Sequence, residues 1–169
     1  MTKQKNIILG VTASIAIYKA CDILRSLKKD GFCVTVVMTP EAEKLMSRIV
    51  FQSLSANKVF CDMFESADNW NIEHIALAEK ADLVLVAPAT ANIIGKVAGG
   101  ICDDLLSCMV CATKAPVLFC PAMNEGMFTN KFVQENIKKL KNAGYKFVQP
   151  RKGELACGKF GLGCLAEVD

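Results

Sequence analysis

The chain has 169 residues and a mass of 18.3 kDa, enough for one domain with a full hydrophobic core. Hydrophobic residues make up 52% of it and charged residues 22%, which excludes a disordered or fibrous protein. The net charge of +3 is too nearly balanced for a dedicated nucleic-acid binder. No uncharged stretch reaches the roughly 18 residues of a membrane helix. Neither nucleic acid nor a membrane is therefore expected as a partner.

Nine cysteines occur at irregular spacing, and several lie in apolar runs where a free thiol packs as a small hydrophobic group. The odd count and the length of the chain argue against a disulfide scaffold. We therefore expect reduced thiols and a cytoplasmic location. Cys108 and Cys111 have the spacing of half a zinc site, but no second pair follows, so no metal is expected.

In chain order, the pattern predicts a strand at 6–11, a helix at 14–29, a strand at 33–38 and a helix starting near 41. A strand at 82–87, helices at 91–97 and 103–112, and a strand at 116–120 follow. A helix at 130–142 and a short strand at 145–148 complete the series. Continuous apolar strands separated by helices are typical of a parallel sheet covered on both faces. We expect one α/β domain over residues 1–169, whose Gly-rich segment 151–169 forms a loop or flap.

Small polar residues follow four of the predicted strands, where an open parallel sheet binds its ligands. They are Ser14, Thr39, Thr90 with Asn92, and Asn124. Such residues also commonly cap helices, so each has a purely structural explanation as well. Four converging strand ends nevertheless favour a phosphorylated ligand. The sequence lacks both G-x-x-x-x-G-K-[ST] and a G-x-G-x-x-G after a strand, which argues against a P-loop kinase or an NAD enzyme.

Five segments carry a more specific signal: GVTASIAIYKA, FQSLSANKVF, HIALAEKADLVLVAPATANIIGKVAGGICDDLL, PAMNEGMF and LACGKFGLGCLAE. In this order they resemble the successive motifs of phosphopantothenoylcysteine decarboxylases, in the homo-oligomeric flavin-containing cysteine decarboxylase family. The resemblance covers nearly the whole chain. It is most specific where His74, PAMN and LACG occur together.

This resemblance implies a Rossmann-like (flavodoxin-like) fold, bound FMN, and assembly as a trimer or a multiple of trimers. It implies decarboxylation of 4'-phospho-N-pantothenoylcysteine to 4'-phosphopantetheine in coenzyme A biosynthesis. In that reaction the flavin oxidises the substrate thiol, CO₂ leaves, and the resulting enethiol is reduced. In bacteria such a domain is often fused to phosphopantothenate-cysteine ligase, which is therefore an expected partner.

The resemblance also assigns roles to individual residues. It makes His74 and Cys157 catalytic, with Cys157 as the late proton donor, although a lone histidine is by itself more often structural. Substrate-binding residues are Asn124, Met127 and Ala156. Cofactor-binding residues, carried over from matching motif positions, are Ser14, Ile15, Thr39, Thr90, Ala91, Asn92, Ile93 and Ala122.

The chain departs from the family pattern at two places. Phe128 stands where the family usually has tryptophan, and Cys164 with Leu165 stands where it often has Arg-Met or Arg-Leu. The second departure removes an arginine from the part of the flap that is expected to meet the substrate phosphate.

Two other functions remain open from the sequence. A peptidyl-cysteine decarboxylase shares the equivalents of His74 and Asn124 but stops at the enethiol, so the cysteine of LACG argues against it. A non-catalytic flavin-binding regulator of a phosphatase typically carries long acidic extensions, which this chain lacks.

Overall fold

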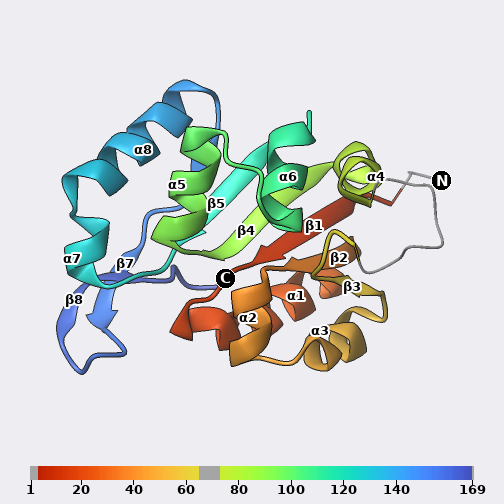
Figure 1. The fold of residues 1–169 in the computed structure, drawn as a ribbon. Coiled ribbons are helices and arrows are strands. Elements are labelled where there is room, and N and C mark those ends of the chain that lie inside the picture. Colours follow the sequence, from red (N-terminus) through yellow and green to blue (C-terminus); the bar gives the residue numbers. More distant parts are fainter. Residues whose placement is uncertain (1–3, 65–72, 169) are drawn as a thin grey trace.

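Six parallel strands form the central sheet in the computed structural model, which describes residues 4–64 and 73–168 (Figure 1). The strand order is β3-β2-β1-β4-β5-β6. The strands are β1 (Asn6–Val11), β2 (Cys33–Met38), β3 (Val59–Phe60), β4 (Leu83–Ala89), β5 (Val117–Pro121) and β6 (Lys146–Phe147). The chain order reverses direction across the sheet between β1 and β4, so the expected site lies beyond the carboxyl ends of these two strands.

Helices cover both faces of the sheet, as predicted. One face packs against the short 3₁₀ helix η1 (Ile15–Tyr18), α1 (Lys19–Lys29), α2 (Pro40–Leu45) and α3 (Arg48–Ser55). The other packs against α4 (Glu73–Lys80), α5 (Ala91–Gly99), α6 (Leu105–Ala112), α7 (Glu125–Phe128) and α8 (Lys131–Asn142). These two layers confirm the Rossmann-like, flavodoxin-like α/β fold.

Burial on both faces explains why the strands are apolar at nearly every position. In β1, Ile7 and Leu9 belong to one hydrophobic cluster, while Ile8 belongs to the cluster on the opposite face. Successive strand side chains point to opposite faces, so a strand with two covered faces must be hydrophobic at both.

The predicted strands at 6–11 and 33–38 coincide with β1 and β2, and the other three lie within a few residues of β4, β5 and β6. The prediction missed the helices α3, α4 and α7, and the two-residue strand β3, which is too short to show a pattern. The predicted helix at 14–29 is η1 followed by α1. A 3₁₀ turn at the start of an α-helix is common.

Segment 151–169, predicted as a loop or flap, contains two strands and is not an irregular loop. Strands β7 (Arg151–Glu154) and β8 (Phe160–Cys164) form an antiparallel hairpin beside the main sheet. At its turn, the Gly158 amide donates to the Leu155 carbonyl over 2.8 Å, and Gly158 has a φ of 75°. Three glycines in the two strands carry no side chains, so the alternation that marks a strand is hidden.

No helix within residues 4–64 and 73–168 is long and apolar enough to cross a membrane. All nine cysteines are free thiols.

Candidate functional site

Each of the four polar strand ends caps a helix. In each case the side-chain oxygen accepts a hydrogen bond from a backbone amide in the first turn of the helix. The pairs of acceptor and donor are Ser14 with Ala16, Thr39 with Ala42, Thr90 with Ile93, and Asn124 with Gly126. The structural explanation of these residues is thus correct. It does not exclude a ligand, because the same four caps bring their helix starts to one edge of the sheet.

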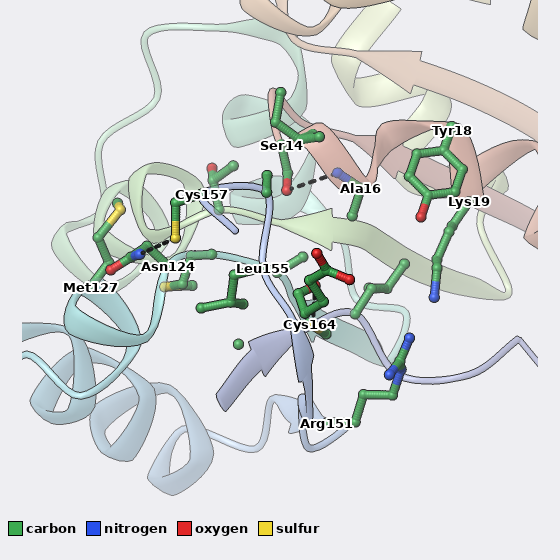
Figure 2. A pocket seen from close by; sticks show the side chains of 18 of the residues that line it. Ser14, Ala16, Tyr18, Lys19, Asn124, Met127, Arg151, Leu155, Cys157 and Cys164 are labelled. Atoms are coloured by element: carbon green, nitrogen blue, oxygen red, sulfur yellow. Dashed lines mark hydrogen bonds between the residues drawn. The ribbon is translucent and has the colours of Figure 1, made fainter. Parts of the chain in front are cut away.

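The main cavity has a volume of about 670 Å³ and lies at this edge (Figure 2). Its walls come from the start of η1, from the segment between β5 and α7, and from the β7–β8 hairpin. A volume of this size is typical of small-molecule sites. Eight of the residues predicted from the sequence line it: Ser14, Ile15, Thr90, Ala122, Asn124, Met127, Ala156 and Cys157.

A second cavity of about 270 Å³ adjoins the first. Its lining includes Thr39, Asn92 and Ile93 from the predicted set. Thr90 and Met127 line both cavities, so the two hollows meet at these residues. Ala91 is not among the residues that line either one.

Asn124 and Cys157 meet across the main cavity. The amide Nδ2 of Asn124 donates to Sγ of Cys157 over 3.7 Å, as the dashed line in Figure 2 shows. Asn124 comes from the end of β5, whereas Cys157 lies in the turn between β7 and β8. The fold therefore brings together the two motifs, PAMN and LACG, on which the resemblance most depends.

His74 lies elsewhere. It is half-buried near the start of α4 and lines neither cavity. Figure 1 shows α4 far from the β7–β8 hairpin. A single copy of the chain therefore does not bring His74 to Asn124 and Cys157.

Phe128 is buried in a hydrophobic cluster that also includes Ile137 and Leu140 of α8. It is not among the residues that line the main cavity. Phe128, which stands where the family usually has tryptophan, therefore packs in the hydrophobic core and does not form a wall of the main cavity.

Thr12 connects two strand ends that sequence reasoning treated separately. Its hydroxyl donates to the Pro88 carbonyl over 2.7 Å and accepts from the Thr90 amide over 3.1 Å. The side chain is only 1% exposed. It thereby fixes Thr90, one of the residues at which the two cavities meet. The sequence signal that could have identified Thr12 is its position as a polar residue directly after a buried apolar strand.

The hairpin docks on the segment that carries Asn124. The Met123 amide donates to the Gly163 carbonyl over 3.0 Å, and Glu125 Oε1 accepts from the Leu162 amide over 3.0 Å. A Cβ at Gly163 would lie 2.1 Å from the Met123 carbonyl oxygen, so only glycine fits here. This contact holds Cys157 above the main cavity.

A charged pair supports the second cavity. Asp104 lines it and caps α6, and its carboxylate lies 2.7 Å from Nζ of Lys96 on α5. Burial lowers the pKa of Lys96, but hydrogen bonds to Asp103 and Asp104 outweigh it and raise that pKa above its usual value. Lys96 therefore stays charged and offsets the negative charge that Asp104 would present to a phosphate.

Two other cysteines are poor proton donors or nucleophiles. Burial raises the pKa of Cys120 to about 11. Burial, together with the neighbouring Cys102, raises the pKa of Cys111 to about 11. Neither lines the two cavities, whereas Cys157 is exposed within the main one. Only the Cys157 and Cys164 thiols lie in the main cavity's lining among the described cysteines.

The chain is similar to known proteins in both sequence and fold. The family model described as Flavoprotein matches residues 1–169. The coenzyme A biosynthesis bifunctional protein CoaBC of Bacillus subtilis is 44% identical over 99% of this chain, which spans only 41% of that relative's length. A probable phosphopantothenoylcysteine decarboxylase of Streptococcus mutans is 42% identical over 98% of this chain and 93% of its own.

A solved structure of a mutant PPC decarboxylase, complexed with pantothenoylaminoethenethiol, superposes with a TM-score of 0.88. It shares 28% identity over 98% of this chain and 93% of that chain.

Proposed function

The chain belongs to the flavoprotein family, and from this premise we propose that it decarboxylates 4'-phospho-N-pantothenoylcysteine to 4'-phosphopantetheine with FMN. The meeting of Asn124 and Cys157 at the main cavity carries this proposal. Their two motifs are those in which the resemblance places substrate binding and proton donation. The Streptococcus mutans relative, matched over 93% of its length, supports the same activity.

The lining of the two cavities fits a flavin mononucleotide. Thr39, Thr90 and Asn92 supply hydroxyl and amide groups suited to a phosphate and a sugar chain. The first turn of α5, after Thr90, adds backbone amides at a positive helix terminus. Ile15 and Ala122 supply apolar surface for a flat ring. When bound, the flavin supplies the two-electron oxidation of the substrate and later returns those electrons.

Asn124 and Cys157 act on the reacting end of the substrate. A neutral amide orients the carboxylate without adding a negative charge that would oppose loss of CO₂. The Cys157 thiol supplies the proton for the reduction step. The Asn124 hydrogen bond to Sγ stabilises the charge left on sulfur once that proton has gone. Met127 and Ala156 complete the contact surface.

We assign His74 the other proton-transfer role and a place in a neighbouring copy's cavity. It lines neither cavity of its own chain, so its catalytic role requires a homo-oligomer. The trimer, or multiple of trimers, implied by the resemblance supplies such neighbours. Residues 65–72, just before His74, lie outside the described residues.

We further propose a cytoplasmic location and cooperation with phosphopantothenate-cysteine ligase. Nine free thiols support a reducing compartment. The relative of Bacillus subtilis, described as a bifunctional coenzyme A biosynthesis protein, supports the link to the ligase.

The test is incubation of purified protein with the phosphorylated cysteine substrate, followed by mass spectrometry. We expect loss of CO₂ and a saturated 4'-phosphopantetheine product, and release of FMN on denaturation. A product that stops at the enethiol would favour the peptidyl-cysteine decarboxylase type of reaction. A protein that takes up FMN but turns over neither kind of substrate would favour a regulatory role.

A further inference from the structure

Two cationic side chains at the main cavity share one carboxylate of the chain itself. Arg151 Nε lies 2.7 Å from Oε1 of Glu167, and Lys19 Nζ lies 3.7 Å from Oε2 of the same residue. Arg151 on β7 and Lys19 at the start of α1 both line the cavity. The side chain of Glu167 is 61% exposed and that of Lys19 only 17%. An exposed carboxylate between two cations marks a place that accepts an anion.

The arginine stands opposite the cysteine that departs from the family pattern. Arg151 and Cys164 are register partners across the β7–β8 hairpin. A Cβ at Gly153 would lie 2.7 Å from Nη1 of Arg151 and 3.1 Å from Sγ of Cys164. The guanidinium and the thiol therefore occupy the same end of the hairpin. The arginine missing at 164 is replaced by one from the neighbouring strand.

The cations and the reacting residues lie at opposite ends of the main cavity. Figure 2 shows Lys19 and Arg151 at one end, and Asn124 with Cys157 at the other. The proposed substrate has the same layout, with a phosphate at one end and a cysteine carboxylate and thiol at the other. An extended substrate with its cysteine at Asn124 would therefore direct its phosphate toward the two cations.

We propose that Arg151, together with Lys19, binds the phosphate of the substrate, and that Glu167 occupies this place until the phosphate displaces it. The inference rests on the proposed function, because it takes the substrate from there. A guanidinium makes paired hydrogen bonds to a phosphate, which carries more negative charge than one carboxylate. Lys19 and Glu167 also line an adjacent surface hollow, so Glu167 has room to turn away.

Three acidic side chains lie around these cations: Glu167 pairs with both, Glu154 lines the main cavity, and Asp22 lines the adjacent hollow. Of these, only Glu154 lines the main cavity, so at the cavity itself Glu154 and Glu167 balance the charges of Arg151 and Lys19. Once Glu167 turns away, Arg151 and Lys19 together outweigh Glu154 and favour an anion. Glu167 is therefore a competitor of the phosphate, and its removal is expected to strengthen binding.

The test compares the phosphorylated substrate with its dephosphorylated counterpart, pantothenoylcysteine. We expect Arg151→Gln to lower kcat/KM for the phosphorylated substrate by about ten- to a hundredfold, mainly through KM, because charge-assisted hydrogen bonds are lost. The dephosphorylated substrate should be affected less than about threefold, since it makes no such bond. Arg151→Lys should recover part of the loss, because it keeps the charge without the paired geometry.

Lys152→Gln is the matched control, because Lys152 is an exposed cation on the same strand and lies outside the cavity lining. It should leave both substrates unaffected. Glu167→Gln should lower KM for the phosphorylated substrate alone. Calorimetric titration with 4'-phosphopantetheine and with pantetheine should reproduce the same ratio of affinities without turnover.

Three results would overturn this assignment. An unchanged ratio between the two substrates in Arg151→Gln would show that the arginine does not contact the phosphate. Loss of bound flavin in Arg151→Gln would show that it holds the cofactor phosphate instead. If the wild-type protein does not decarboxylate the phosphorylated substrate, the proposed function fails and the inference falls with it.

Discussion

The side-chain amide of Asn124 links the end of β5 to the Cys157 thiol on the hairpin. Its oxygen accepts from the Gly126 amide over 2.9 Å, and its nitrogen donates to Cys157 Sγ over 3.7 Å. One side chain therefore both starts helix α7 and faces the residue proposed as proton donor. These two uses can be separated, because an aspartate keeps the first and loses the second.

Asn124→Asp should abolish turnover while the fold stays intact. Aspartate caps a helix about as well as asparagine, so α7 should still form. The new negative charge would repel the substrate carboxylate, and the donor to Cys157 would be lost. Asn130→Asp is the control, because Asn130 caps α8 in the same way outside the cavity. Steady-state kinetics on flavin-loaded protein decide the matter; near-normal turnover in Asn124→Asp would remove Asn124 from the site.

His74→Asn should lower kcat by about 10²–10⁴, the usual contribution of a proton-transfer group. Because His74 lines neither cavity of its own chain, we expect it to act on a neighbouring copy. Co-expression of His74→Asn with Asn124→Asp chains should then restore about a quarter of the activity, since randomly mixed copies in a closed ring rebuild some intact sites. Action within one chain would leave every site with one defect, and the mixture would stay inactive.

Thr12→Val should lower the free energy of unfolding by about 1–3 kcal/mol. The substitution keeps the shape of the side chain but leaves the Pro88 carbonyl and the Thr90 amide without their buried partner. Thr12→Ser keeps the hydroxyl and loses one methyl group, so it should cost only about 1 kcal/mol. Urea unfolding of the flavin-loaded proteins measures both values. A negligible loss in Thr12→Val beside a larger loss in Thr12→Ser would mean that packing of the methyl group, and not hydrogen bonding, stabilises this position.

Local pattern was sufficient for five of the six strands of the main sheet and for the polar residues that follow four of them. Strands such as β1 and β2 are buried on both faces, so their residues are apolar throughout and their limits are visible in the sequence. The polar residues after them were found because parallel strands end at one edge of the sheet. The hairpin was missed because its three strand glycines hide the alternation of side chains.

The contacts that complete the cavity join residues far apart in the chain, and no local pattern predicts them. Thr12 meets Thr90, and Arg151 meets Glu167, through folding alone. His74 shows a second limit of prediction from sequence. Its motif predicted a role in catalysis, but a motif does not state which copy of the chain that residue serves.

Gly163→Ala should displace the hairpin and abolish activity while the central sheet stays folded. A Cβ here would lie 2.1 Å from the Met123 carbonyl oxygen, and φ is 144°, a conformation that other residues rarely adopt. Gly144→Ala is the control, because Gly144 has a φ of 96° but nothing within 4 Å of an added Cβ. It should cost about 1–2 kcal/mol of stability and no activity. Hydrogen exchange should show faster exchange of residues 151–164 only in Gly163→Ala; normal protection there would mean that the hairpin tolerates the methyl group.

Cys157→Ser should separate the two halves of the reaction. Oxidation and loss of CO₂ depend on the cofactor and on the end of the substrate held by Asn124, so they should continue. Reduction of the enethiol should stop, because a serine hydroxyl is a much weaker acid than a thiol. The variant should therefore accumulate a decarboxylated product about two mass units lighter than 4'-phosphopantetheine, the pair of hydrogens that the cofactor has not returned. Cys111→Ser, outside both cavities, should give the saturated product.

The competing donor is Cys164, which also lines the cavity but whose thiol donates to the Glu154 carbonyl over 3.3 Å. If Cys157→Ser forms the saturated product at the wild-type rate while Cys164→Ser accumulates the lighter one, the proton comes from Cys164 and the role of Cys157 is misassigned.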